Sequence, residues 1–397
     1  MFRTNLGQGV EEHMIDTMSP NISILGIGTA LPSYRIEQGE VLEKLEEALQ
    51  DSPNSVRWAR RIFKQCGVAT RYTCEPNLIA HGSRSRYLPS EGLDDVPSTA
   101  ERMGIYKRES IPLALEAARD ALRDGEIEGS HITHLITVSC TGQFLPGLDA
   151  VLVKEMGLSA RVQRIPLTFQ GCAAGLKAIQ LARTLMEGQT SRKILIVCVE
   201  LCTLHFQPSS DREALFGASF FGDGASACVI GAADKNSKGL FQLGEGHSVL
   251  MPDCSEEMIW EVGNYGFDLY LSTNIPKLLG RYLTSEMESL LDGEEAPSLW
   301  AIHPGGRGIV DIVQQMFELR DDQVQYSRNI LHDYGNLSSA TILFVLKAMR
   351  EDLVSRNSGS SSGVALAFGP GLTAELLKFT YLPSAILQER IIDHVHS

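Results

Sequence analysis

The sequence predicts an α/β fold built from two halves of similar order. Apolar runs as long as strands alternate with helical patterns along most of the chain, and this alternation is typical of a mixed or parallel sheet with helices on its faces. Each half also places a chemically useful residue near the start of an apolar helix, Cys172 in the first half and Asn336 in the second. No short-period repeat accompanies this pattern. We therefore expect an internally duplicated α/β fold.

The first half is expected to follow a flexible extension at 1–21. This extension contains Glu11, Glu12 and Asp16 and has no apolar core, so we do not expect a signal peptide. Strands are then expected at 22–28, 134–139, 162–167, 193–199 and 225–230, and helices at 41–49, 56–65, 111–122, 148–156 and 172–186. The polar stretch at 87–98 is rich in Ser, Pro and Gly and predicts a loop.

The second half shows the same alternation. It is expected to contain helices at 275–291, 308–316 and 338–352, a strand at 299–303, and a closing hairpin of strands at 364–368 and 375–381. The hairpin brackets the turn-forming residues Gly369, Pro370 and Gly371. We expect four parts in the chain, namely the extension at 1–21, a half with the nucleophile at 22–235, a second half at 236–382 and a tail at 383–397.

Composition narrows the class of protein. The 397 residues are 43% hydrophobic and 21% charged, as in ordinary globular proteins, and their formal net charge is −14. Nucleic-acid binders and membrane-surface proteins need basic surface, so this charge argues against both classes. No apolar run approaches the length of a membrane span, and we expect a cytoplasmic protein.

The eight cysteines are expected to be reduced. Most of them lie in apolar runs, such as Cys198 within 194–198 and Cys228 within 225–229, which favours buried thiols over disulfides. None has zinc-finger spacing to a downstream pair of ligands, so we expect no metal site.

Three short segments of small residues carry groups suited to catalysis. They are QGCAAG at 170–175, HPGG at 303–306 and YGNLSS at 334–339. The segments supply the Cys172 thiol, the His303 imidazole and the Asn336 carboxamide, which are a nucleophile and two groups able to activate it and polarise a carbonyl. The expected helix start favours a thiolate at Cys172. The combination predicts an enzyme that forms a covalent thioester.

Each of these residues also has a structural interpretation that the sequence leaves open. An isolated cysteine such as Cys172 is more often simply buried, and a lone histidine at a strand end, such as His303, is more often structural. Asn336 follows Gly335 and suits a turn or a helix N-cap. The glycine flanks and the presence of all three favour the catalytic interpretation, although the sequence does not show that they meet in space.

Five motifs in order resemble the type III polyketide synthases, the chalcone synthase-like proteins built on the thiolase fold. The motifs are QGC at 170–172, FGDGA at 221–225, WAIHPGG at 300–306, YGNLSS at 334–339 and FGPGL at 368–372. The resemblance covers nearly the whole chain from Ile22 to Tyr381. The run WEVG at 260–263, followed by Gly266 and Phe267, is more similar to the bacterial branch than to the plant one. The resemblance implies two duplicated α/β halves in a five-layered αβαβα arrangement.

The resemblance implies an acyltransferase that uses coenzyme A thioesters and no other cofactor. Cys172, paired with His303, would take a starter acyl group from coenzyme A. Decarboxylation of malonyl-CoA would then give an enolate whose oxygen accepts hydrogen bonds from His303 and Asn336. The enolate would attack the acyl-cysteine, and repeated cycles would end in cyclisation to a pyrone, a resorcinol or a related phenolic. A homodimer is implied as well.

The resemblance also implies a set of substrate-cavity residues. They are Cys140, Leu145, Cys202, His205, Phe221, Leu269, Ser338, Gly369, Pro370 and Gly371. Phe221 would be a gatekeeper, and Leu269 stands where a second gatekeeper is usually Phe. Cys140, Cys202 and His205 stand where plant relatives carry Thr. Leu145 would reach across the dimer interface.

The residues that differ from the family's usual ones affect which starter acyl group we expect the cavity to hold. Leu269 and Cys140 favour a roomier or more apolar cavity, whereas His205 argues the other way. We therefore expect a long-chain fatty acyl starter, with ordinary core packing as the alternative explanation of all three residues.

Coenzyme A carries phosphates, so its tunnel needs cations. Arg61 and Lys64 match two basic positions of the family, but the third position is Val68. Arg307, just after the histidine motif, would compensate. A solvated helix face is the alternative explanation for these charges.

Two rival enzyme classes use the same residue types. A β-ketoacyl-ACP synthase III also uses Cys, His and Asn, but the HPGG and FGPG motifs favour the polyketide synthase. A papain-like cysteine hydrolase is compatible with the spacing of Cys172, His303 and Asn336, but its cysteine would not lie in mid-chain and the flanking motifs do not match. A non-catalytic scaffold is the least favoured alternative, because all three chemical groups are present.

Overall fold

The structure is a computed structural model that describes residues 21–78, 86–88, 95–233 and 240–383. The expected extension and tail lie almost wholly outside the described residues, as does the middle of the loop expected at 87–98. No helix of the described residues is long and apolar enough to cross a membrane.

One mixed sheet runs through the described part of the chain. Its strands lie in the order β11-β12-β13-β8-β1-β7-β6-β4-β5. Their bounds are β1 (Ile22–Ala30), β4 (His134–Ser139), β5 (Gln163–Thr168), β6 (Lys193–Leu201), β7 (Asp223–Ala232), β8 (Leu240–Leu250), β11 (Leu299–Ile302), β12 (Ser361–Gly369) and β13 (Thr373–Leu382). The two halves of the chain join where β1 pairs with β8 over a short stretch.

The two halves repeat one topology. In the first half, β1 pairs antiparallel with β7, β7 antiparallel with β6, and β6 parallel with β4. In the second, β8, β13, β12 and β11 pair in the same order and directions. Helix α5 (Ala174–Met186) leads into β6 and α10 (Thr341–Ser355) leads into β12, and Cys172 and Asn336 precede these two helices. The predicted duplication is confirmed, and it places each residue shortly before the central helix of its half.

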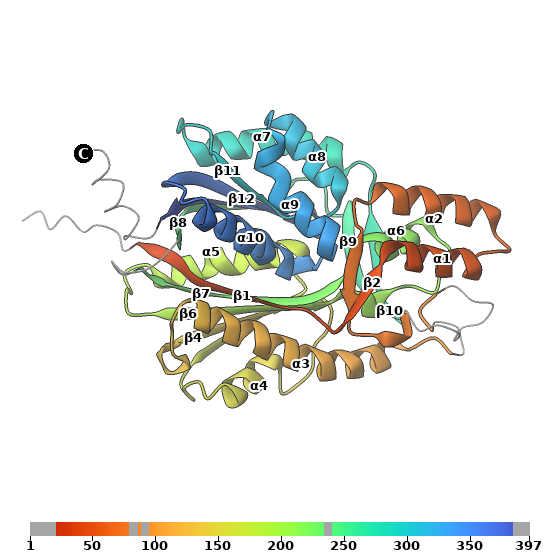
Figure 1. Cartoon of the computed structure of the whole chain (residues 1–397), viewed down its shortest axis with the longest axis horizontal. Helices are drawn as coiled ribbons and strands as arrows, with labels where there is room; N and C mark the ends of the chain where they lie inside the picture. The colour runs from red at the N-terminus through yellow and green to blue at the C-terminus, as the bar shows by residue number, and fades with distance from the viewer. Residues whose placement is uncertain (1–20, 79–85, 89–94, 234–239, 384–397) are drawn as a thin grey trace, which may run out of the picture.

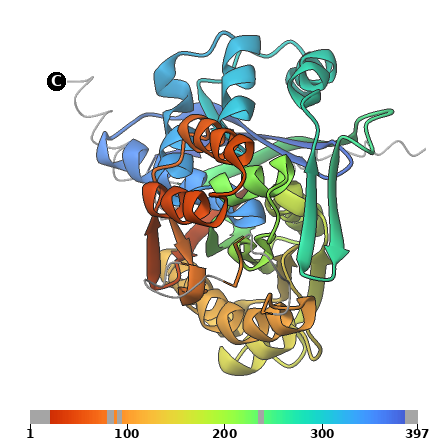
Figure 2. The ribbon, with the colours of Figure 1, turned by 90° about the vertical axis from the view of Figure 1, so that its right-hand side faces the viewer.

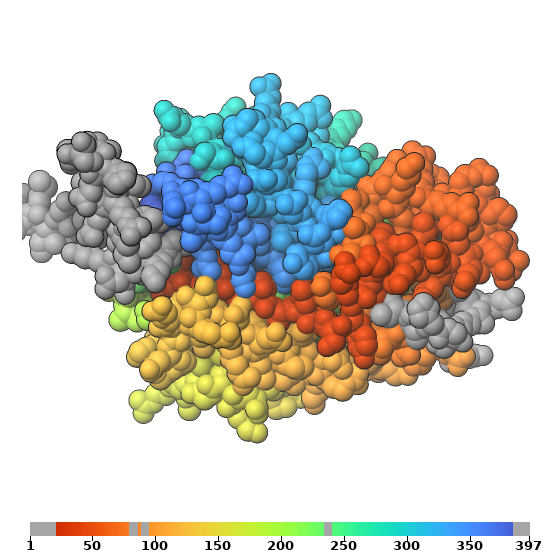
Figure 3. All heavy atoms as spheres, viewed as in Figure 1, coloured from red at the N-terminus to blue at the C-terminus, as the bar shows by residue number. Residues whose placement is uncertain are grey.

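Helices and sheets alternate in five layers (Figure 1). Helices α3 (Thr99–Asp124) and α4 (Leu148–Glu155) cover the outer face of the first-half strands, α5 and α10 lie between the two sets of strands, and α7 (Ile275–Leu291), α8 (Arg307–Met316) and α9 (Asp321–Tyr334) cover the second half. The space-filling view shows α3 in gold below the blue α9 and α10 (Figure 3). The expected αβαβα arrangement is therefore confirmed.

The remaining elements gather at one end of the layered core (Figure 2). They are α1 (Gln38–Ala48), α2 (Pro53–Gln65), α6 (Arg212–Phe220), the strand pair β2 (Tyr34–Glu37) and β3 (Thr70–Thr73), and the hairpin β9 (Met258–Gly263) and β10 (Gly266–Leu271). Short 3₁₀ turns complete the fold, namely η1 (Pro76–Leu78), η2 (Gly129–His131), η3 (Gly171–Ala173), η4 (Cys202–His205) and η5 (Ser338–Ala340). This end of the molecule forms much of the wall of the cavity described below.

Two helices begin at other residues than the sequence predicts. The helix expected from 111 already begins at Thr99, because the Ser98 hydroxyl accepts a hydrogen bond from the Glu101 backbone and the Glu101 carboxylate accepts one from the Ser98 backbone. The helix continues through Pro112. The α-helix expected from Cys172 begins two residues later, after the turn η3.

All eight cysteines are free thiols. Seven of them are buried, and Cys172 is half-buried. Within the described part of the chain, no group of three or more His, Cys, Asp or Glu side chains is placed to hold a metal ion.

Candidate active site

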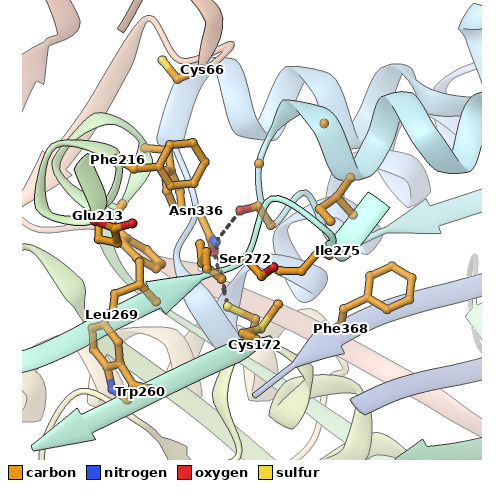
Figure 4. A pocket seen from close by; sticks show the side chains of 18 of the residues that line it. Cys66, Cys172, Glu213, Phe216, Trp260, Leu269, Ser272, Ile275, Asn336 and Phe368 are labelled. Carbon is orange, nitrogen blue, oxygen red and sulfur yellow. Dashed lines mark hydrogen bonds between the residues drawn. The ribbon is translucent and has the colours of Figure 1, made fainter. Parts of the chain in front are cut away.

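Most of the candidate residues surround one cavity of about 660 Å³ between the layered core and its helical end (Figure 4). Those that line it are Arg61, Cys140, Cys172, Cys202, Phe221, Leu269, Arg307, Asn336, Ser338 and Pro370. Six other predicted site residues lie outside the lining, namely Lys64, Leu145, His205, His303, Gly369 and Gly371.

Two glycines allow the turn that presents Cys172. Gly171 has a φ of +63°, and a Cβ built on it would stand 2.1 Å from the Pro370 ring. A Cβ on Gly175 would stand 2.2 Å from the Ser339 carbonyl oxygen. The start of α5 and the turn η5 therefore approach each other backbone to backbone, and the two segments that carry Cys172 and Asn336 come together.

The pKa of the Cys172 thiol lies above its usual value despite the place of the residue at a helix start. Burial raises the pKa of this thiol to about 11, although hydrogen bonds from Ser338 and Asn336 act in the opposite direction. The effect expected of the helix start is outweighed, because desolvation disfavours the charged form more than the local donors favour it. The thiol therefore needs a base.

The side-chain amide of Asn336 is oriented toward Cys172. Its Oδ1 accepts a hydrogen bond from the Ser338 backbone at 2.8 Å and lies 4.0 Å from Cys172 Sγ, where it can also accept from the thiol. Nδ2 lies 3.8 Å from Cys172 Sγ and donates to the Gly305 carbonyl at 3.2 Å (Figure 4). The backbone N–H of Asn336 donates to the Phe220 carbonyl at 2.8 Å. Asn336 therefore caps a turn through Oδ1 and contacts the Cys172 thiol with both ends of its amide.

His303 is a buried, neutral imidazole beside this pair. Its backbone N–H donates to the Leu366 carbonyl at 2.8 Å, which extends the pairing of β11 with β12. Among the described residues, neither ring nitrogen has a hydrogen-bond partner, and burial lowers the pKa of the ring to about 3. Nε2 lies 3.7 Å from the point where a Cβ on Gly305 would stand. The ring thus packs against the glycine whose carbonyl accepts from Asn336, although no hydrogen bond of the described residues joins it to Cys172.

We expect His303→Gln to move the alkylation of Cys172 to higher pH. Burial holds the thiol pKa at about 11 and the imidazole pKa at about 3, so a thiolate near neutral pH requires the two groups to share one proton. Glutamine keeps a polar side chain but accepts no proton. The rate of reaction with iodoacetamide, measured across pH, should show a higher midpoint in the variant, and identical profiles would show that His303 does not hold the proton.

A buried carboxylate lies behind the cavity and was not among the predicted residues. Glu200 accepts hydrogen bonds from the Cys140 backbone and from the hydroxyls of Thr141 and Ser339, and burial raises its pKa. The sulfur of Cys140 lies 3.1 Å from the hydroxyl oxygen of Ser338. A signal was present in the sequence, because Glu200 is the one acid in the apolar run 194–201.

His205 does not contribute polar groups to the main cavity. Its Nε2 donates to the Thr141 carbonyl at 2.7 Å, and its Nδ1 accepts from the Phe267 backbone at 3.1 Å. The ring stacks on Phe267 with centroids 4.1 Å apart. The expectation that His205 makes the cavity more polar was wrong, because both nitrogens are already engaged.

Trp260 forms a wall of the cavity that the sequence did not indicate. Its indole N–H donates to the Cys140 carbonyl at 2.8 Å, and this hydrogen bond fixes the ring in the cavity wall. It lies opposite Leu269 in the hairpin β9–β10. Leu269, at the second gatekeeper position, thus pairs with an aromatic residue that a hydrogen bond holds in place.

Two family models together match most of this chain. The model for the N-terminal domain of chalcone and stilbene synthases matches residues 11–234, and the model for the C-terminal domain matches residues 242–383. The chain belongs to the chalcone and stilbene synthase family of type III polyketide synthases. The activity of this family is that of an acyltransferase, as the sequence predicted, and its substrates are coenzyme A thioesters.

Two curated relatives illustrate the similarity. The chain is 31% identical over 361 residues to "Type III polyketide synthase 21" of Oryza sativa subsp. japonica, which covers 89% of this chain and 92% of the relative. It is 29% identical over 370 residues to "Probable polyketide synthase 1" of Dictyostelium discoideum, and it spans only about 11% of the length of that protein.

Two solved structures have the same fold as this chain and are similar to it in sequence. The crystal structure of PKS-I from the brown alga Ectocarpus siliculosus superposes with a TM-score of 0.83 at 25% identity, covering 92% of this chain and 100% of that one. The C-terminal type III polyketide synthase domain of Steely1, a type I/III hybrid from Dictyostelium, gives a TM-score of 0.82 at 26% identity, covering 91% and 99%.

The mouth of the cavity in this type III polyketide synthase is basic and aromatic. Trp58 is 44% exposed, and the guanidinium carbons of Arg61 and Arg212 lie 5.7 and 5.6 Å from the centroid of its ring. Arg307 also lines the mouth and lies 3.4 Å from the Asp311 carboxylate. Trp58 and Arg212 were not predicted, and the predicted Lys64 lies outside the lining.

Leu145 protrudes from the chain beside the first-half strands. It is 92% exposed, which is unusual for a large apolar side chain. It does not line the cavity of its own chain.

Proposed function

We propose that this polyketide synthase condenses malonyl-CoA repeatedly onto an acyl-CoA starter held as a thioester on Cys172. The observation that carries the proposal is the contact between the Asn336 amide and Cys172, whose Sγ lies 3.8 Å from Nδ2 and 4.0 Å from Oδ1. A nucleophile and a donor thus meet in one cavity, and the base His303 packs against Gly305 of the cavity wall, which is a set of groups that thioester condensation requires.

In the loading step, His303 takes the proton of Cys172. The thiolate attacks the carbonyl carbon of the starter thioester, and the bond to coenzyme A breaks. The departing coenzyme A thiolate takes the proton back from His303. The neutral state of both groups before loading supports this sequence, since one proton moves between them and no net charge enters the buried site.

In the extension step, the bond between malonyl-CoA and its carboxylate breaks, and carbon dioxide leaves. The electron pair moves into the thioester and gives an enolate, whose oxygen accepts hydrogen bonds from Asn336 Nδ2 and from a ring N–H of His303. The enolate carbon attacks the acyl carbon on Cys172, and the thiolate leaves. One fixed donor of this kind contributes about 3 kcal/mol to a transition state that carries an oxyanion.

The three arginines at the mouth, Arg61, Arg212 and Arg307, are suited to the phosphates of coenzyme A. No salt bridge of the described residues engages Arg61 or Arg212, so their charge is available to a ligand. Arg212 supplies a third cation, which is missing at the family's third basic position because that position is Val68 in this chain. A local basic patch of this kind binds phosphates even though the whole chain carries a net charge of −14.

We expect Arg61→Ala to raise the KM for malonyl-CoA about tenfold, because a charge-assisted hydrogen bond is lost. Lys64→Ala is the matched control, since Lys64 lies one turn away on the same helix and outside the cavity lining. Steady-state kinetics at low and high salt would measure both variants. Equal effects of the two substitutions would contradict the assignment of Arg61.

The starter is proposed to be a long-chain fatty acyl group, and the product a pyrone, a resorcinol or a related phenolic. Leu269 in place of an aromatic gatekeeper and the sulfur of Cys140 in the lining support an apolar cavity.

The exposed side chain of Leu145 supports a homodimer in which Leu145 reaches the partner subunit. A cytoplasmic location fits substrates that are coenzyme A thioesters.

Mass spectrometry of the products from a panel of acyl-CoA starters tests this function. Each starter is incubated with malonyl-CoA or with malonyl-ACP, and chain length and cyclisation are determined from the products. Polyketides of two or more extensions from malonyl-CoA are expected. Exclusive use of the ACP thioester, with a single extension, would identify a β-ketoacyl-ACP synthase III instead.

A further inference from the structure

The C-terminal end of helix α6 is joined to Asn336 through the backbone. The last carbonyls of an α-helix have no partner within the helix, so they accept hydrogen bonds from elsewhere. In α6 the Phe220 carbonyl accepts from the Asn336 N–H at 2.8 Å, and the Gly222 N–H just beyond the helix donates to the Asn336 carbonyl at 3.1 Å. Both backbone groups of Asn336 are therefore held by this helix end, and the position of its amide depends on where the helix ends.

Arg71, in strand β3, caps the same helix end. Its Nη1 donates to the Ala218 carbonyl at 2.7 Å and to the Phe221 carbonyl at 2.9 Å. Its Nη2 donates to Gln38 Oε1 at 2.8 Å, and Gln38 Nε2 in turn donates to the Ser219 carbonyl at 2.6 Å. A cation is favoured at the C-terminal end of a helix, where the peptide dipoles concentrate negative charge. The two side chains thus satisfy three further carbonyls at this helix end.

The stem of Arg71 also packs against the residue before Asn336. Gly335 has a φ of +72°, and a Cβ built on it would stand 3.1 Å from Arg71 Cγ and 2.5 Å from the Phe220 carbonyl oxygen. Arg71 is fully buried, and burial lowers the pKa of its guanidinium to about 10, so the group is still charged near neutral pH. Burying a cation is costly unless its donors are used. This cation uses them where the two segments that hold Asn336 meet.

We infer that Arg71 is a positioning residue for the Asn336 amide, because it fixes the end of α6 that holds the Asn336 backbone. This inference rests on the proposed function, in which Asn336 Nδ2 stabilises the enolate formed from malonyl-CoA. Arg71 is absent from the lining of the cavity, so we assign it no contact with the substrate. A small displacement of Asn336 is enough to slow the reaction, because a hydrogen bond weakens steeply when its distance and angle change.

A double-mutant cycle on malonyl-CoA decarboxylation tests the inference. We expect Arg71→Met to slow the release of labelled carbon dioxide about tenfold or more in the otherwise unmodified protein, and less than about twofold in protein that already carries Asn336→Ala. Arg71→Lys keeps the cation but not the fork of donors, so its rate should lie between those of Arg71→Met and the unmodified protein. Equal factors for Arg71→Met in the two backgrounds would overturn the inference, since Arg71 would then act independently of Asn336.

Arg102→Met is the matched control for the loss of a buried guanidinium. Arg102 is also fully buried, and its Nη1 donates to the carbonyls of Leu204 and Phe206, which lie outside α6. Any effect of this substitution on decarboxylation should therefore be the same with and without Asn336→Ala. If Arg102→Met also lost its effect in the Asn336→Ala background, the cycle would be reporting general damage, and the inference would fail.

Hydrogen exchange provides a second test that does not depend on catalysis. Gln38→Leu removes part of the cap at a half-buried position, and it is the milder variant should Arg71→Met not fold. In either variant the Asn336 N–H should exchange about tenfold faster than in the unmodified protein, while the amides of α5 keep their rates. Unchanged exchange at Asn336 would overturn the inference, as would equal acceleration in α5. If the unmodified protein releases no carbon dioxide from malonyl-CoA, the proposed function itself fails, and the exchange at Asn336 still decides whether Arg71 positions it.

Discussion

Replacing Cys172 with alanine is expected to abolish both starter loading and product formation. Cys172 is the one thiol of the described residues that contacts the Asn336 amide. Alanine removes the nucleophile and little else, because Gly171 and Gly175 determine the backbone of the turn. Intact-mass spectrometry after incubation with an acyl-CoA should show no adduct, and chromatography should show no polyketide.

The same variant should still release carbon dioxide from malonyl-CoA. Decarboxylation depends on donors to the thioester oxygen, and His303 and Asn336 remain in place. Cys254→Ala is a suitable control, since Cys254 is a buried free thiol outside the cavity. Continued condensation by Cys172→Ala would refute the covalent mechanism, whereas loss of condensation in Cys254→Ala would point to a general effect of removing a thiol.

The alternation of strands and helices was predictable because it depends on local patterns. The strand at 193–199 and the helix at 275–291 appear as β6 and α7 with nearly the expected bounds. The start of α3 was harder, since Pro112 interrupts a helical pattern that the Ser98 cap begins much earlier. The hairpin β9–β10 was not predicted, and its position depends on contacts with α6 that are distant in sequence.

The candidate site was predictable only in part, for a similar reason. The motifs around Cys172 and Asn336 mark the residues, and the repeated topology brings them together. Their electrostatics did not follow from the motifs, because burial raises the pKa of Cys172 against the effect expected of a helix start. Arg212 and Trp58 join Arg61 at the cavity mouth from two different helices, and nothing in their local sequence indicates that proximity.

Asn336→Ala is expected to slow the decarboxylation of malonyl-CoA by a factor of about 100 to 1,000. Nδ2 is the donor that the proposed mechanism assigns to the thioester oxygen, and the loss of one such donor typically has this effect. The substitution also removes the acceptor of the Ser338 backbone N–H, so part of the effect could arise from a displaced turn. A second variant is needed to separate the two causes.

Asn336→Asp separates them. Aspartate keeps an oxygen that accepts from the Ser338 backbone, and it replaces the Nδ2 donor with a second carboxylate oxygen that repels an enolate. If Asn336 acts as an oxyanion donor, Asn336→Asp should decarboxylate malonyl-CoA at least as slowly as Asn336→Ala, and its unfolding temperature should fall because a buried carboxylate oxygen then faces the Gly305 carbonyl. Release of labelled carbon dioxide and a thermal melt measure these quantities. Recovery of decarboxylation in Asn336→Asp would instead mean that the turn at Ser338, and not the donor, is what Asn336 supplies.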